Sequence, residues 1–116
     1  MITNPNDLIK ALDSLPQKIR NQKIKVIDAE KIKNDTKLKY DVAFGMALIG
    51  ALAPNATQKK AIATTKTEKK AEELIESEYN LKKEEAGLKY LEDRFISLRK
   101  ISSIEQELMR VNISGT

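Results

Sequence analysis

The chain has 116 residues, of which 41% are hydrophobic, 33% charged and 4% aromatic, and its formal net charge is +4. It contains no His, Cys or Trp, which excludes zinc fingers, thiolate chemistry, disulfide frameworks and imidazole acid–base catalysis. The length corresponds to one domain, and high charge with few aromatic residues is typical of long helices. We therefore expect residues 1–116 to form a single all-α domain.

Charge is distributed unevenly along the chain. Residues 1–70 hold 14 basic and 7 acidic residues, a net charge of +7. Residues 71–116 hold 7 basic and 10 acidic residues, a net charge of −3. This asymmetry favours either an anionic partner for the first part or self-association between the two parts. A solvated helix surface is the alternative explanation.

The first residues predict a short helix over residues 1–15. Asn4 can act as an N-cap, and Pro5 suits the first helical position. Leu15 precedes Pro16, and a residue before proline is biased away from the helical region. The helix is therefore expected to end there.

Residues 16–53 form the next predicted segment, which is basic at first and apolar afterwards. Eight Lys and Arg residues lie between residues 18 and 39 against three acids, a net charge of +5. The apolar positions of this part are Ile19, Ile24, Ile27 and Ile32. Asn34-Asp35-Thr36 either breaks the helix or caps a new one from Thr36 to Leu52, and the sequence leaves both possibilities open.

The apolar end of this segment predicts an interface between subunits. Its stripe follows a 4-3-4-3 spacing over Leu38, Val42, Gly45, Ile49 and Leu52. Further apolar residues widen the stripe to more than half of the helix, so burial on two sides is expected, partly against a second subunit. The predicted oligomer interface consists of Leu38, Val42, Phe44, Met46, Leu48, Ile49 and Leu52. Small residues, including Gly45, would permit close helix approach.

A single long helix is predicted over residues 57–111, after a turn around Pro54 with Asn55 or Thr57 as the N-cap. Leu74, Leu81, Leu88 and Phe95 repeat every seven residues, as in a coiled coil, but Ser77 and Glu84 interrupt the seam. The predicted stripe continues through Leu91, Leu98, Ile101, Ile104, Leu108 and Val111. Ser102-Ser103 is a possible bend, and residues 112–116 are expected to fray.

These elements predict a short N-terminal helix followed by a hairpin of long helices, partly coiled-coil-like and oligomeric. Sequence motifs for catalysis, nucleotide binding or metal binding are absent, so we expect no enzyme, cofactor, metal or small-molecule substrate. The most apolar run, Val42 to Ala53, is shorter than the about 20 residues that span a bilayer, and no signal peptide is evident. A cytoplasmic protein without a membrane partner is expected.

A lysine-rich stretch, residues 58–70, is the strongest binding signal. It reads QKKAIATTKTEKK, and Lys59, Lys66 and Lys70 share one helical face. Lys and Thr side chains donate to phosphate oxygens, so this face could follow a nucleic-acid backbone. The absence of Arg argues against base-specific recognition. The alternative is a charged, solvated helix start.

Residues 35–48, DTKLKYDVAFGMAL, resemble the UvsY-type recombination mediators of bacteriophages, and the order of elements extends this resemblance to residues 28–110. Those small helical proteins assemble into rings, bind single-stranded DNA and help to load a recombinase onto DNA covered by single-strand-binding protein. The resemblance implies these activities and partners, and a bacterial host cytoplasm. Together with the charge pattern, it gives the nucleic-acid-binding candidates Lys37, Lys39, Tyr40, Lys59, Lys60, Lys66, Lys69 and Lys70.

A helical protein-interaction module is the alternative function. Such an adaptor, assembly chaperone or inhibitor would bind its partner through the apolar helix of residues 38–52. In that case the lysines would serve solubility alone.

Overall fold

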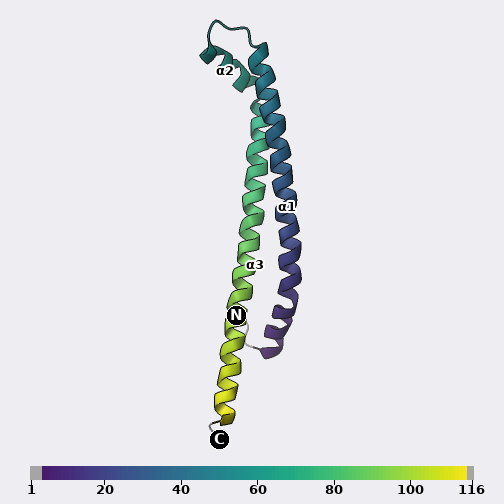
Figure 1. Cartoon of the computed structure of the whole chain (residues 1–116), viewed down its shortest axis with the longest axis vertical. Helices are drawn as coiled ribbons and strands as arrows, with labels where there is room; N and C mark the ends of the chain where they lie inside the picture. Colours follow the sequence, from purple (N-terminus) through teal and green to yellow (C-terminus); the bar gives the residue numbers. More distant parts are fainter. Residues whose placement is uncertain (1–3, 115–116) are drawn as a thin grey trace. The chain divides into compact units, whose positions relative to one another are not determined.

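The computed structural model describes residues 4–114, which form three α-helices without a strand (Figure 1). Helix α1 spans Pro5–Gly50, α2 spans Ala56–Lys66 and α3 spans Glu68–Ser114. The predicted all-α class with long helices is confirmed. The predicted oligomerisation remains a prediction.

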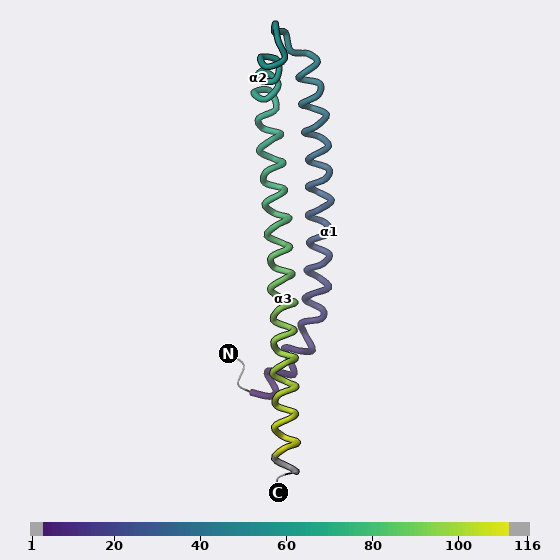
Figure 2. The backbone as a smooth tube through the Cα atoms, turned by 60° about the vertical axis from the view of Figure 1, so that its left-hand side comes forward, coloured from purple at the N-terminus to yellow at the C-terminus, as the bar shows by residue number. Residues whose placement is uncertain are grey.

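The chain divides into two compact units. The central unit is Lys25–Glu84, and the terminal unit joins the chain up to Ile24 with the chain from Glu85 onward. Parts of α1 and α3 belong to each unit. Within each unit these two helices lie side by side and run antiparallel, as Figures 1 and 2 show.

A coiled-coil seam joins α1 to α3 within each unit. Its residues are buried or half-buried and recur at spacings of three and four, the period of a coiled coil. In α1 they are Leu8, Leu12, Leu15, Ile19, Gln22, Val26, Ala29, Lys33, Thr36, Tyr40, Ala43 and Ala47. On the other side they begin at Thr67, just before α3, and continue in α3 with Lys70, Leu74, Ser77, Leu81, Glu84, Leu88, Leu91, Phe95, Leu98 and Ser102. The polar positions Ser77 and Glu84 therefore continue the seam and do not interrupt it.

The terminal unit has the larger apolar core. Leu8, Leu15 and Leu98 form a buried cluster, and Leu91 and Phe95 pack against it. Burying one such leucine stabilises a protein by about 1.5–3 kcal/mol. This cluster fixes the N-terminal turns of α1 against α3.

The predicted end of the first helix at residue 15 is wrong, because α1 continues through Pro16. Asn4 does cap this helix, since its Oδ1 accepts a hydrogen bond of 2.9 Å from the Asn6 backbone N–H. Proline has no N–H to donate and bends a helix without necessarily ending it. Figure 2 shows the bend near the purple end of α1. Leu8 and Leu15 pack in this cluster on the N-terminal side of Pro16, and the half-buried Ile19 continues the same face of α1 after it.

The possible break at residues 34–36 does not occur. The Thr36 hydroxyl donates to the Ile32 carbonyl at 2.7 Å, a bond within an uninterrupted helix. Asp35 pairs with Lys39 one turn later and does not cap a new helix. The helix instead ends at Gly50, before the predicted boundary at residue 53.

Asn55 is the N-cap of α2, one of the two predicted candidates. Its backbone is extended, with φ −143° and ψ 167°, and its side chain accepts a hydrogen bond from the Gln58 N–H at 2.9 Å. This bond satisfies one of the free amide groups at the start of the helix.

The prediction of a single long helix over residues 57–111 is wrong, because the helix is interrupted at Thr67, between α2 and α3. The hydroxyls of Thr64, Thr65 and Thr67 each donate to the carbonyl four residues earlier, and such bonds bend helices. Thr67 is buried beside Ala63, so packing stabilises the break. Figure 1 shows α2 at an angle to α3.

Helix α3 continues without a break through Ser102-Ser103 and ends at Ser114. Residues 112–114 are therefore helical and not frayed, and residues 115–116 lie outside the described part of the chain. Four residues predicted to lie in the core are exposed: Ile101, Ile104, Leu108 and Val111. In the terminal unit α1 starts beside Leu98, so the last turns of α3 extend beyond it (Figures 1 and 2).

Candidate nucleic-acid interface

All of the predicted nucleic-acid-binding residues lie in the central unit. Three come from α1, three from α2 and two from the first turn of α3. They are Lys37, Lys39, Tyr40, Lys59, Lys60, Lys66, Lys69 and Lys70. The chain has no acidic residue between Asp41 and Glu68, so the α1–α2 connection and α2 carry positive charge alone.

Most of the lysines have no internal counter-charge. Lys39 lies 3.2 Å from Asp35 and Lys70 lies 3.8 Å from Glu73. Five of the seven predicted lysines are exposed and have no ion pair to a carboxylate among residues 4–111: Lys37, Lys59, Lys60, Lys66 and Lys69. Exposed ion pairs contribute about 0–1 kcal/mol, so Lys39 is also readily released to another anion.

Helix α2 and the end of α1 form a groove of about 690 Å³ in the central unit. Apolar groups of Leu48 and Ile49 line it together with Lys59 and Lys60. Ala56 and Thr57 complete the lining at the N-terminal turn of α2, which contains no acid. The groove thus combines an apolar surface with two cations and the positive end of a helix dipole.

Tyr40 occupies a different environment from the lysines. It is half-buried in the seam, with its ring centroid 6.0 Å from that of Phe44 at an interplanar angle of 31°. This tilted arrangement is one that aromatic pairs favour. Its packing role therefore competes with stacking on a base, and the lysines are the main candidates for contact with an anion.

The seven predicted interface residues fall into two groups. Phe44 and Leu48 are half-buried, and the other five are exposed: Leu38, Val42, Met46, Ile49 and Leu52. The exposed fraction reaches 88% for Ile49 and 97% for Leu52. Leu38, Val42 and Ile49 lie on the side of α1 opposite the seam, where coiled-coil helices normally carry polar residues. We call Leu38, Val42, Gly45, Ile49 and the flanking Met46 the outer face.

The sequence analysis did not predict that several other apolar residues lie on the surface. Ile24, Ile27 and Ile32 on α1, and Ile75 and Tyr79 on α3, are exposed. Extending the seam spacing of three and four through both helices from Leu8 and Leu74 would have separated these residues from the seam.

The described residues contain no group of three or more His, Cys, Asp or Glu residues that could hold a metal ion. Within the same part of the chain, no helix has the length and apolar character needed to cross a membrane. Comparison with protein-family models, curated proteins and solved structures finds no match to this chain.

Proposed function

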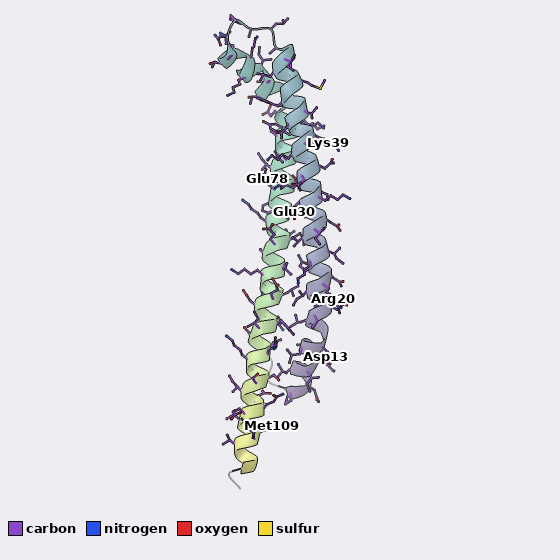
Figure 3. The ribbon with its side chains drawn as sticks, in the orientation of Figure 1. Asp13, Arg20, Glu30, Lys39, Glu78 and Met109 are labelled. Atoms are coloured by element: carbon purple, nitrogen blue, oxygen red, sulfur yellow. The ribbon has the colours of Figure 1, made fainter. Side chains whose placement is uncertain are left out.

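We propose that this protein is a non-enzymatic accessory protein that binds the backbone of single-stranded nucleic acid through the central unit and acts as an oligomer. The observation that carries the proposal is the set of three exposed, unpaired lysines, Lys59, Lys60 and Lys66, in a region without acids from residue 42 to residue 67, with Lys37 and Lys69 on either side of it. Figure 3 shows the charged side chains Arg20, Glu30, Lys39 and Glu78 and the apolar Met109 along the ribbon.

Binding of this kind needs no sequence recognition. Lysine is a compact point charge that contacts phosphate, whereas bidentate reading of base edges is mainly the role of arginine. Residues 21–93 contain no arginine. Affinity should therefore come from the release of counterions and be similar for oligonucleotides of different sequence.

A role in phage-type recombination rests on the resemblance of residues 35–48 to UvsY-type mediators. It adds a recombinase and a single-strand-binding protein as proposed partners, and a bacterial cytoplasm as the proposed location. The lysines Lys37 and Lys39 in this segment belong to the proposed binding surface.

Fluorescence anisotropy with a labelled single-stranded oligonucleotide tests nucleic-acid binding. Five phosphate contacts give a slope of log affinity against log salt of about −3.5, or about a 100-fold loss between 50 and 200 mM salt. The K59Q/K60Q/K66Q variant should reduce the magnitude of this slope by about 2. The matched control K82Q/K83Q/K89Q removes three exposed lysines from α3 and should leave the slope nearly unchanged. Equal effects of both variants, or a salt-independent affinity, would contradict the proposal.

A protein-interaction module is the second candidate, because the outer face exposes large apolar side chains such as Val42 and Ile49. In that case V42D or I49D would abolish binding to the partner, and K59Q/K60Q/K66Q would preserve it. An isothermal titration with a recombinase of a phage host would measure both variants. Binding that follows the lysines would reject this candidate.

A further inference from the structure

We propose that the outer face of α1 binds the outer face of a second copy, in an antiparallel two-fold arrangement centred on Gly45. This inference deepens the oligomeric part of the proposed function, on which it rests. It specifies which surface each copy contributes and how the two helices are oriented.

The outer face has the exposure and shape that such a contact requires. Leu38, Val42, Met46 and Ile49 are each more than half exposed, although they lie in the middle of a well-formed helix. Coiled-coil packing against α3 uses the opposite side of α1, so the outer face is free in the central unit. Adjacent exposed apolar residues of this kind mark interaction surfaces.

Gly45 has no role within the chain that would explain it. A Cβ atom added at this residue would meet no atom within 4 Å. Glycine within a helix costs about 1 kcal/mol relative to alanine, and α1 has an ordinary helical backbone here. A second helix crossing at Gly45 could approach closely, which supplies a reason for glycine at this position.

The residues around Gly45 are arranged symmetrically. Leu38 precedes it by seven residues and Val42 by three, while Ile49 follows by four and Leu52 by seven. In an antiparallel pair centred on Gly45, Val42 therefore lies within one residue, about 1.5 Å along the axis, of Ile49 of the second copy, and Leu38 faces the turn that contains Leu52. The same patch on both copies is self-complementary, as a two-fold contact requires.

Charge complementarity supports the same orientation. Asp41 is exposed, has no ion pair among residues 4–111, and is four residues before Gly45. The antiparallel arrangement brings it to Ile49 of the second copy, which lines the groove with Lys59 and Lys60. One carboxylate at the edge of the contact then meets two lysines, so this edge retains a positive charge for nucleic acid. In a parallel pair, Asp41 would face Asp41.

Disulfide cross-linking without nucleic acid tests the orientation, because the natural chain contains no cysteine. In the antiparallel pair, a mixture of V42C and I49C copies should form the mixed disulfide. Either variant alone should form little, because the two Val42 positions are six residues apart along the axis, about 9 Å. Cross-linking of each variant with itself would indicate a parallel pair and overturn the proposal. So would absence of the mixed disulfide.

Light scattering after size exclusion tests the role of Gly45. G45A should weaken the dimer by about tenfold, because its added methyl group lies at the crossing point. G50A is the matched control, since a Cβ at Gly50 also meets nothing within 4 Å but lies on the seam side of the helix end, and it should leave the dimer unchanged. An undiminished G45A dimer would overturn the proposal.

The two assays also separate this inference from the proposed function. A dimer with the expected cross-link but without salt-dependent oligonucleotide binding would support the interface and reject the nucleic-acid function. Salt-dependent binding by a protein that shows no V42C–I49C cross-link would support the function and reject the interface.

Discussion

The terminal and central units hold α1 against α3 by the same coiled-coil spacing but with different residues. In the terminal unit the seam buries Leu8, Leu15 and Leu98. In the central unit much of the seam is small or polar, with Ala29 and Thr36 on α1 and Ser77 on α3. Large apolar residues of the central unit lie on the outer face.

This difference separates two effects that usually coincide. The spacing of three and four determines which side of each helix faces its neighbour, even where the residues there are polar. The size of the buried side chains determines how much stability results, at about 25 cal/mol per Å² of apolar surface. The terminal unit therefore gains more stability from internal burial, whereas the central unit has a smaller apolar seam.

The largest expected effect is the loss of a core leucine from the terminal unit. Leu15 is only 2% exposed, so L15A should lower the free energy of unfolding by about 2–5 kcal/mol in urea denaturation. L81A removes the most buried large apolar residue of the central seam, at 9% exposure, and should cost less. L38A, on the outer face, should change the free energy of unfolding by about 0.5 kcal/mol or less at concentrations where the chain is monomeric. If L38A were as costly as L15A, the distinction between the units would fail.

Removal of the α2 cap should have the next largest effect. N55A deletes the acceptor of the Gln58 N–H and should cost about 1 kcal/mol, measured by thermal unfolding. N80A is the matched control, because it makes the same change from asparagine to alanine at an exposed position within α3 that caps no helix. This control should be neutral or slightly stabilising, because alanine is the better helix former. A similar loss in both variants would show that the cap contributes little.

A smaller effect of opposite sign is expected at Gly87 in the terminal unit. A Cβ there would lie 3.1 Å from the Gln22 Nε2 atom, the end of a flexible side chain that can move. The gain in helix propensity should therefore exceed the cost of this shift, and G87A should stabilise the chain by about 0.5 kcal/mol. Thermal unfolding of G87A can be compared with that of G45A at a concentration where the chain is monomeric. The stability gain should be larger for G45A, because its added methyl group meets no neighbouring atom. A net loss in G87A would indicate that Gln22 is held rigidly.

The smallest effect is expected for the exposed Asp35–Lys39 pair of the central unit. D35N should change the free energy of unfolding by less than about 0.5 kcal/mol, since both side chains are more than half exposed. Denaturation at low and high salt should give nearly the same difference between D35N and the natural chain. A large, salt-sensitive loss would mean that surface charge and not the seam holds this unit together.

The sequence was sufficient to predict the helical class and the phase of the α3 seam from Leu74 to Leu98, and it limited the α2 cap to Asn55 or Thr57. Each depends on local information, namely composition, a capping side chain and the seven-residue repeat from Leu74 to Phe95. Several helix boundaries were not predicted correctly, most clearly those at Pro16 and Thr67. Continuity through Pro16 accompanies burial on both sides of it, of Leu15 against the distant Leu98 and of Ile19 in the seam, and the break at Thr67 coincides with burial of Thr67 and Ala63.

The candidate site was predicted only in part, because its local features can be read from the sequence and its contacts with distant residues cannot. The composition identified a lysine-rich stretch, and the structure places Lys59, Lys60 and Lys66 on the surface. The composition did not show that Tyr40 packs against Phe44, or that Ile101 is exposed. Those features depend on which helix lies opposite, and periodicity along one helix does not specify its neighbour.

The small residues of the central seam also have a consequence for heat capacity. Unfolding raises heat capacity mainly by exposing apolar surface, and Ala43, Ala47 and Ser77 hide little of it. The central unit should therefore contribute less than the average of about 12–15 cal/mol/K per residue. Its stability should vary gently with temperature, whereas the leucine-rich terminal unit should show a sharper optimum. A calorimetric scan of the natural chain should then show a smaller rise in heat capacity on unfolding than its length suggests.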